Sequence, residues 1–350
     1  MQNEMQTKID ALVTATLAQK KIPGLALAVV EKGELSYTHA YGVRNLETQE
    51  PLQVNALFHL SSVTKLFVGP ALLQLRERGQ LDLDAPVVRY LPYFKLNDAR
   101  VNEITVRQMM MHTSGMPDTD EYGWENPEYD DGALERYVRS IANESLIAAP
   151  NEKYFYSNIA YEVLGDVIAK VSRMTFEEFV AQSILRPLKM DKSTLLLTEA
   201  DRNLLATPHT FYVDGKVTEN VIVSSVFPYN RAHAPSSTLY SNVFDLSRFA
   251  RAFLERGELD GTRILDAETV AEMWTPAFQK QSTFWPHIGL TWNIGTRQGQ
   301  RFVGHSGEDV GFSTMLLLAP ERGVALIYLC NADANLFDDA GDEIFDLLLR

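Results

Sequence analysis

The chain has 350 residues, 45% of them hydrophobic and 22% charged, which favours a globular protein of about two domains. Its formal net charge of −14 argues against nucleic acid or an anionic membrane as a partner, because both require basic patches. The N-terminus lacks the basic and apolar pattern of a signal peptide, and no run approaches about 18 apolar residues, so we expect a cytoplasmic protein without a transmembrane helix. Metal-ligand spacings and glycine-rich phosphate loops are missing from the sequence, so we expect neither a metal nor a cofactor.

The first elements are a helix and a hairpin. Residues 5–19 have apolar positions at helical spacing, and Pro23-Gly24 ends that segment. Residues 25–30 and 35–41 then predict two strands joined by a tight turn.

A helix is predicted from Ser62 to Arg78, stopping at Gly79. Pro70 lies inside it and should kink it or loosen the preceding turn. From there to about 234 the pattern indicates helices and long polar loops, with helices at 104–111, 159–172 and 176–186. Residues 119–133 are acidic and aperiodic, and two interpretations stay open: a loop over an active site, or a solvated surface loop.

The last third changes character. Helices are predicted at about 243–256, 267–274 and 336–349, and strands at 288–294, 301–305, 312–318 and 324–330. The single cysteine, Cys330, ends the last strand and should be a buried, inert thiol. Strands at both ends predict an α+β fold in which residues 1–60 and 235–350 form one discontinuous domain with an antiparallel sheet. Residues 61–234 form a mainly helical domain, and the chemistry lies in the cleft between the two.

Ser62 and Lys65 are the first candidates for chemistry. On a helix, residues three apart share one face, so Lys65 can take the proton that makes the Ser62 hydroxyl a useful nucleophile. By itself this pair is a weak signal, because an N-cap serine and a solvated lysine have the same spacing.

Two further segments could complete a site. Tyr156 and Asn158 stand at a loop-to-helix junction, where a lysine cation would favour the tyrosinate and make it a usable base. Asparagine offers donors and an acceptor to an ester or amide. Gly304-His305-Ser306-Gly307 ends a predicted strand, whose edge could lend a backbone N–H to an oxyanion. We expect His112, after the helix at 104–111, to be structural and to anchor the loop that follows it.

Taken in this order, the three segments resemble the penicillin-recognising serine hydrolases, which include class C β-lactamases, DD-peptidases and related esterases. The similarity covers residues 8–335, including the segments 103–117, 239–249 and 304–331. It implies a β-lactamase/transpeptidase-like fold and a covalent acyl-enzyme. It also implies the site residues: Ser62 as nucleophile, Lys65 and Tyr156 as proton acceptors, Asn158, His305, Ser306 and Gly307 as substrate-binding residues, and the backbone N–H of Glu308 with that of Ser62 as oxyanion donors.

The sequence departs from that family at the substrate-binding strand. His305 replaces the lysine that attracts the antibiotic carboxylate in β-lactamases, and a histidine is only partly charged near neutrality. Glu308 stands where many relatives have a small residue, and Ser236-Ser237 replaces a glycine pair. We therefore expect an esterase that acts on small acyl esters. The alternatives are a D-amino-acid peptidase or amidase, a β-lactamase, and a non-catalytic binding protein on the same fold. The oligomeric state is left open.

Overall fold

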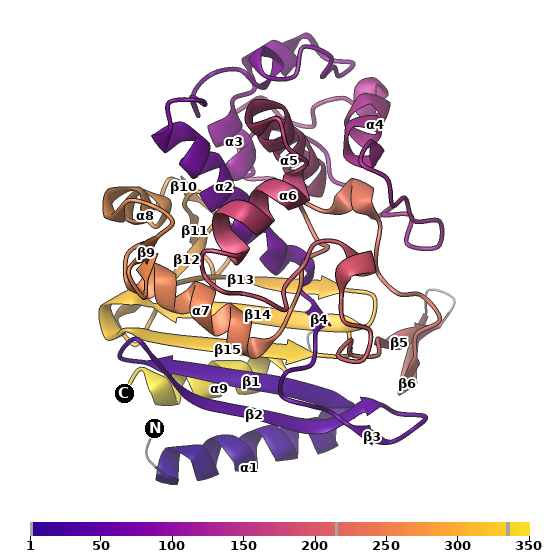
Figure 1. Ribbon diagram of the computed structural model, residues 1–350, viewed down its shortest axis with the longest axis vertical. Helices are drawn as coiled ribbons and strands as arrows, with labels where there is room; N and C mark the ends of the chain where they lie inside the picture. Colours follow the sequence, from indigo (N-terminus) through magenta and orange to yellow (C-terminus); the bar gives the residue numbers. More distant parts are fainter. Residues whose placement is uncertain (1–2, 214–215, 334–336) are drawn as a thin grey trace.

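The computed structural model describes residues 3–213, 216–333 and 337–350 and centres on a nine-stranded sheet (Figure 1). All its strand pairs are antiparallel. The strands follow the order β10 (Phe278–Gln279), β11 (His287–Ile288), β12 (Asn293–Arg297), β13 (Gln300–Asp309), β14 (Phe312–Ala319), β15 (Val324–Cys330), β1 (Gly24–Glu31), β2 (Glu34–Asn45) and β3 (Glu50–Pro51).

Strands β1 and β15 join the two ends of the chain, with Leu25 opposite Cys330 and Glu31 opposite Val324. Both strands are buried along nearly their whole length, since each face of the sheet is covered. The expectation that both ends of the chain complete one antiparallel sheet is therefore correct, and so is the α+β fold class. The exact domain boundaries stay a prediction.

Helices lie on both sides of the sheet (Figure 1). Helices α1 (Asn3–Lys20) and α9 (Asp338–Leu348) contact each other and cover one face, on β2 and β15. Helix α7 (Val243–Leu254) packs on β1 and β15 from the other face, where the helical part of the chain also lies. The remaining helices are α2 (Lys65–Glu77), α3 (Val106–Met110), α4 (Ala133–Ser140), α5 (Asn158–Ser172), α6 (Phe176–Val180) and α8 (Ala267–Met273).

Several local expectations were wrong. The strand expected at 288–294 is divided between β11 and β12, because Thr291 has a φ of 69° and interrupts the extended backbone. The helix expected at 176–186 changes after α6 into a π-helical turn, Ala181–Leu185. Elements that the sequence did not indicate are α4, the hairpin of β5 (His209–Val213) with β6 (Lys216–Val223), and the short pairs β4 (Phe58–His59) with β7 (Tyr240–Ser241) and β8 (Glu258–Leu259) with β9 (Thr262–Arg263).

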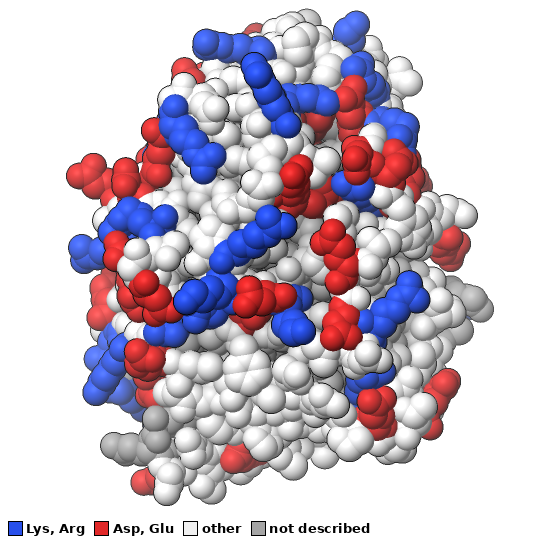
Figure 2. All heavy atoms as spheres, in the orientation of Figure 1, with Lys and Arg blue, Asp and Glu red and all other residues white. Residues whose placement is uncertain are grey.

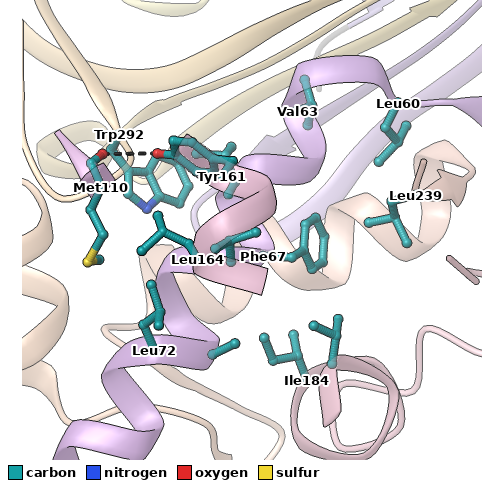
Figure 3. Close-up of a cluster of buried hydrophobic side chains, with 14 of the residues drawn as sticks. Leu60, Val63, Phe67, Leu72, Met110, Tyr161, Leu164, Ile184, Leu239 and Trp292 are labelled. Atoms are coloured by element: carbon teal, nitrogen blue, oxygen red, sulfur yellow. Dashed lines mark hydrogen bonds between the residues drawn. The ribbon is translucent and has the colours of Figure 1, made fainter. Parts of the chain in front are cut away.

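The main core fills the space between the sheet and the helical part of the chain. Figure 3 shows Val63 and Phe67 among the buried side chains, and Tyr161 donating a hydrogen bond to the Met110 carbonyl at 2.9 Å. Both Val63 and Phe67 are essentially inaccessible to solvent. The buried side chains of Val63 and Phe67 therefore anchor the segment that carries Ser62 and Lys65 to the core.

The face of the molecule in Figure 2 intersperses Lys and Arg with Asp and Glu and shows no large patch of one sign. A mixed surface of this kind gives no basic footprint for a polyanion on that face. Among the described residues, no helix is both long and apolar enough to cross a membrane.

Candidate active site

The segment with Ser62 begins as a short 3₁₀-helix, Ser61–Thr64, and continues into α2 at Lys65. The predicted α-helix is therefore wrong for its first turn, which is 3₁₀-helical. Ser62 and Lys65 still lie on the same face, because a 3₁₀-helix has three residues per turn and places residues i and i+3 in line. Pro70 lies within α2, beyond the turn that aligns the pair.

Residues of strands β4, β13 and β14 contact the turn at Ser62 and hold it in place. Ser61 has a φ of 50°, an uncommon left-handed conformation, and its hydroxyl lies 3.2 Å from His59 Nδ1. Thr314 of β14 donates to the Leu60 carbonyl at 2.7 Å. A Cβ added at Gly307 of β13 would lie 2.4 Å from that same carbonyl oxygen, so only glycine lets the strand approach this closely.

Lys65 Nζ makes three contacts of different kinds. It lies 3.0 Å from Ser62 Oγ, 2.6 Å from Asn158 Oδ1 and 2.8 Å from the Ser236 carbonyl oxygen. A neutral amine has two N–H groups and one lone pair. The two oxygens that can only accept satisfy the N–H groups, so the lone pair of a neutral Lys65 points at the Ser62 hydroxyl.

Burial makes that neutral form accessible. The Lys65 side chain is fully buried, and desolvation lowers its pKa to about 7, while the negative charges of Glu162, Asp118 and Asp309 act in the opposite direction. A general base is most effective when its pKa is near the working pH. Lys65 therefore has the position and the proton affinity of a base for Ser62.

Tyr156 approaches Ser62 from another side, with its hydroxyl donating to Ser62 Oγ at 2.8 Å. Burial raises its pKa well above 10, so it is a neutral phenol near pH 7. The sequence favours a tyrosinate here, but desolvation and the nearby Asp118 and Glu162 charges penalise the phenolate more than the hydrogen bond with Ser62 stabilises it. The phenol holds a proton that it can give to a leaving group.

His112 was expected to anchor the loop that follows it, but its side chain instead contacts Tyr156 and Ser157, just before α5. Its ring stacks on the Tyr156 ring with centroids 4.3 Å apart, and its Nδ1 accepts the Ser157 N–H at 3.0 Å. Burial lowers its pKa well below 6.5, so the ring is neutral and Nδ1 stays an acceptor.

Asn158, the first residue of α5, is oriented by Asp118. The Asp118 carboxylate accepts the Asn158 backbone N–H at 2.7 Å and its Nδ2 at 3.1 Å. Since this leaves Oδ1 facing Lys65, the amide orientation is determined by the hydrogen bonds on both of its ends. Asp118 follows the segment 103–117 of the family resemblance, and no sequence pattern predicts its contact with Asn158.

A second acid that the sequence did not reveal lies behind Lys65. Glu162 is one helical turn after Asn158 and has no solvent exposure. Its Oε1 accepts hydrogen bonds from the Ser236 hydroxyl at 2.5 Å and from His233 Nδ1 at 3.1 Å. Ser236 thus joins the two groups, since its carbonyl accepts from Lys65 and its hydroxyl donates to Glu162.

The β13 residues take different positions. His305 is buried, and burial lowers its pKa to about 3, so the partial charge expected there is absent. Its Nδ1–H donates to the Ser306 carbonyl at 2.5 Å, and its ring lies 6.3 Å from that of Tyr156. Ser306 is half-buried, and the side chain of Glu308 is exposed.

Asp309, and not Glu308, directs a carboxylate into the interior. It accepts hydrogen bonds from Trp124 Nε1 and from the Ser237 hydroxyl, both at 2.9 Å. Trp124 stacks on Tyr122, with the ring planes 6° apart. This part of the acidic loop 119–133 is therefore attached to the strand of the candidate site, while other residues of the loop are exposed.

Lys280 is a further cation beside the site that the sequence did not single out. It follows β10, and its Nζ lies 4.6 Å from the centroid of the Tyr154 ring. Burial lowers the pKa of Lys280 to about 8.

The single cysteine is unsuited to chemistry. Cys330 is buried, as expected, and burial raises the pKa of its thiol. Among the described residues, no group of three or more His, Cys, Asp or Glu side chains is placed to hold a metal ion.

Comparison with known proteins identifies the family of this chain. The family model described as Beta-lactamase matches residues 9–350. The chain is 28% identical over 346 residues to penicillin-binding protein 4* of Bacillus subtilis, covering 91% of this chain and 70% of that protein. It is 25% identical to protein flp of Staphylococcus aureus, covering 95% of this chain, and it spans only 64% of the length of that relative.

Solved structures show the same fold. The octameric penicillin-binding protein homologue from Pyrococcus abyssi has a TM-score of 0.84 at 25% identity, covering 98% of this chain and 77% of that one. D-amino acid amidase from Ochrobactrum anthropi SV3 has a TM-score of 0.82 at 23% identity, covering 99% and 98%. The chain belongs to the β-lactamase family, within the penicillin-recognising serine hydrolases.

Proposed function

We propose that this protein is a serine hydrolase that forms a covalent acyl-enzyme on Ser62 and acts on small acyl esters. The observation that carries the proposal is the convergence on Ser62 Oγ of Lys65 Nζ, at 3.0 Å, and the Tyr156 hydroxyl, at 2.8 Å. One group has the proton affinity of a base, and the other retains a proton that it can donate.

In the acylation step, Ser62 Oγ forms a bond to the substrate carbonyl carbon while its proton passes to Lys65 Nζ. The backbone N–H groups of Ser62 and Glu308 would receive the oxyanion, and removing one such donor typically costs about 10²–10³ in rate. When the C–O bond to the alcohol breaks, Tyr156 protonates the departing oxygen, and the Lys65 ammonium returns a proton to Tyr156. Water then attacks the acyl-enzyme, releasing the acid and restoring the Ser62 hydroxyl.

The neutral state of His305 supports esters as the first substrate class, because a neutral ring supplies no fixed positive charge at that position for an anionic antibiotic. The protonated Tyr156 also supports a second candidate, a D-amino-acid peptidase or amidase, because an amine leaves only when it takes up a proton.

Hydrolysis of p-nitrophenyl acetate, D-alanine p-nitroanilide and a chromogenic cephalosporin by the purified chain separates these activities. We expect kcat/KM to be highest for the ester. Rapid turnover of the anilide or the cephalosporin with no ester hydrolysis would contradict the choice of substrate class while leaving the serine mechanism intact.

A fluorophosphonate probe tests the mechanism itself. We expect stoichiometric labelling of the wild-type chain and none of Ser62→Ala, with unchanged circular dichroism. A folded wild-type protein that neither labels nor hydrolyses any of the three substrates would instead identify a non-catalytic binding protein.

A further inference from the structure

The direction of the Lys65 lone pair depends on two acceptors. These are Asn158 Oδ1, 2.6 Å from Nζ, and the Ser236 carbonyl oxygen, 2.8 Å from Nζ. If either oxygen moved, the amine could rotate about its C–N bond, and the lone pair would turn away from the Ser62 hydroxyl, which lies 3.0 Å from Nζ. The groups that hold these two oxygens in place therefore bear on the reaction.

Helix α5 is connected to both acceptors. Asn158 is its first residue and carries one of them. Glu162 and Gly165 follow four and seven residues later, and this spacing places all three on one face of the helix. All three are buried, and Glu162 and Gly165 contact residues 233–236, the segment that carries the second acceptor.

Glu162 holds this segment by hydrogen bonds. Its Oε1 accepts from the Ser236 hydroxyl at 2.5 Å and from His233 Nδ1 at 3.1 Å. Its Oε2 is buried and has no hydrogen-bond partner among the described residues. A buried carboxylate with an unpartnered oxygen costs folding free energy, so the stability of the fold does not account for a glutamate here, whereas a role in the site does.

Gly165 brings the same segment close to α5 by packing. A Cβ added at Gly165 would lie 2.1 Å from Pro235 Cγ. The proline ring is rigid, so the helix can approach it this closely only at a glycine. Ser236 is thus held through its own side chain and through the preceding proline, and its carbonyl faces Lys65.

We propose that Ser236 is a positioning residue for the base, and that α5 fixes its carbonyl through Glu162 and Gly165. The lone pair of Lys65 is thereby aimed at the Ser62 hydroxyl. This inference rests on the proposed function and adds to it the part of the fold that orients the base. It also gives the serine at 236 a role, since a glycine, as in the family pair that it replaces, has no hydroxyl to donate.

The rate of labelling by a fluorophosphonate tests the proposal, because it reports the activation of Ser62 whatever the substrate class. Ser236→Ala removes the hydroxyl and retains the backbone carbonyl. We expect labelling to reach completion, as in the wild type, with a rate constant about 10-fold lower, the usual effect of losing one hydrogen bond to a charged group. Complete labelling distinguishes slower chemistry from a loss of folded protein. In ester hydrolysis the same variant should lower kcat and leave KM unchanged.

Two substitutions of Glu162 separate its charge from its hydrogen bonds. Glu162→Gln and Glu162→Met both remove the charge, but only glutamine retains an oxygen that can accept from the Ser236 hydroxyl. At pH 9, where Lys65 is mostly neutral, the glutamine variant should label about 10-fold faster than the methionine variant. Gly165→Ala places a Cβ against Pro235 and should also slow labelling, although it contacts no reacting group.

Ser247→Ala is the matched control, because Ser247 is also buried and its hydroxyl donates to the Val243 carbonyl within α7, at 2.5 Å. It should label at the wild-type rate. A wild-type labelling rate in Ser236→Ala, or equal rates in the two Glu162 variants, would overturn the proposal while leaving the serine mechanism intact. A folded wild-type chain that does not label at all would instead contradict the proposed hydrolase function, and this inference with it.

Discussion

Replacing Glu162 by Gln tests how the protein sets the protonation of its base. Glu162 has no solvent exposure, and its negative charge raises the pKa of Lys65 against the larger effect of burial, which leaves that pKa at about 7. In the proposed mechanism the neutral Lys65 is the active form, so kcat/KM should rise with pH through about 7. Glu162→Gln removes the charge and retains an oxygen for the Ser236 hydroxyl. The rising limb should therefore move to lower pH.

The magnitude follows from the interaction of two unit charges. Ser236 joins the two groups through contacts of 2.8 and 2.5 Å, so they lie at most about 10 Å apart, and with an effective dielectric constant of about 20 they interact by at least about 1.7 kcal/mol. Because 1.36 kcal/mol corresponds to about one pKa unit, the limb should move down by about one pH unit. The other ionisable groups near Lys65 stay in place in the variant: Asp118, Asp309, Tyr156, Tyr161, His112 and His305.

The assay is kcat/KM for p-nitrophenyl acetate between pH 5 and 9, with circular dichroism to confirm folding. Glu178→Gln serves as control, because Glu178 is exposed on α6 and its replacement changes the net charge by the same amount. If a folded Glu162→Gln had the same acid limb as the wild type, Lys65 would not be the titrating base or Glu162 would not be coupled to it.

Three further substitutions test other parts of the site. Tyr156→Phe removes the proton donor and should lower kcat about 10²–10⁴-fold with little change in KM, and a wild-type kcat would exclude Tyr156 as the acid. His112→Leu leaves the Ser157 N–H without an acceptor and should cost about 1–3 kcal/mol in urea denaturation while slowing acylation, and an unchanged kcat would limit His112 to stability. Gly307→Ala places a Cβ against the Leu60 carbonyl and should lower both the Tm and kcat, so unaltered values of both would contradict the close approach of β13.

Local patterns predicted most of the sheet and the terminal helices. Strand β15 is an uninterrupted apolar run, and its length and flanking turns indicate a buried strand. The sequence does not predict the β5–β6 hairpin, because β6 consists of exposed and half-buried residues and has no buried apolar face. Thr291, with its positive φ, interrupts a run that otherwise reads as one strand.

The sequence by itself determined the arrangement of Ser62 and Lys65, because a spacing of three residues puts them in line on either an α- or a 3₁₀-helix. It also placed Tyr156 and Asn158 at a loop-to-helix junction, where α5 begins at Asn158 with Ser157 as its N-cap. Only the tertiary structure decided the protonation states, since desolvation depends on what surrounds a group and not on its neighbours along the chain. Burial favours the neutral form of Lys65 and keeps Tyr156 protonated and His305 neutral, and the fold brings Glu162 and Lys280 beside the site from distant segments.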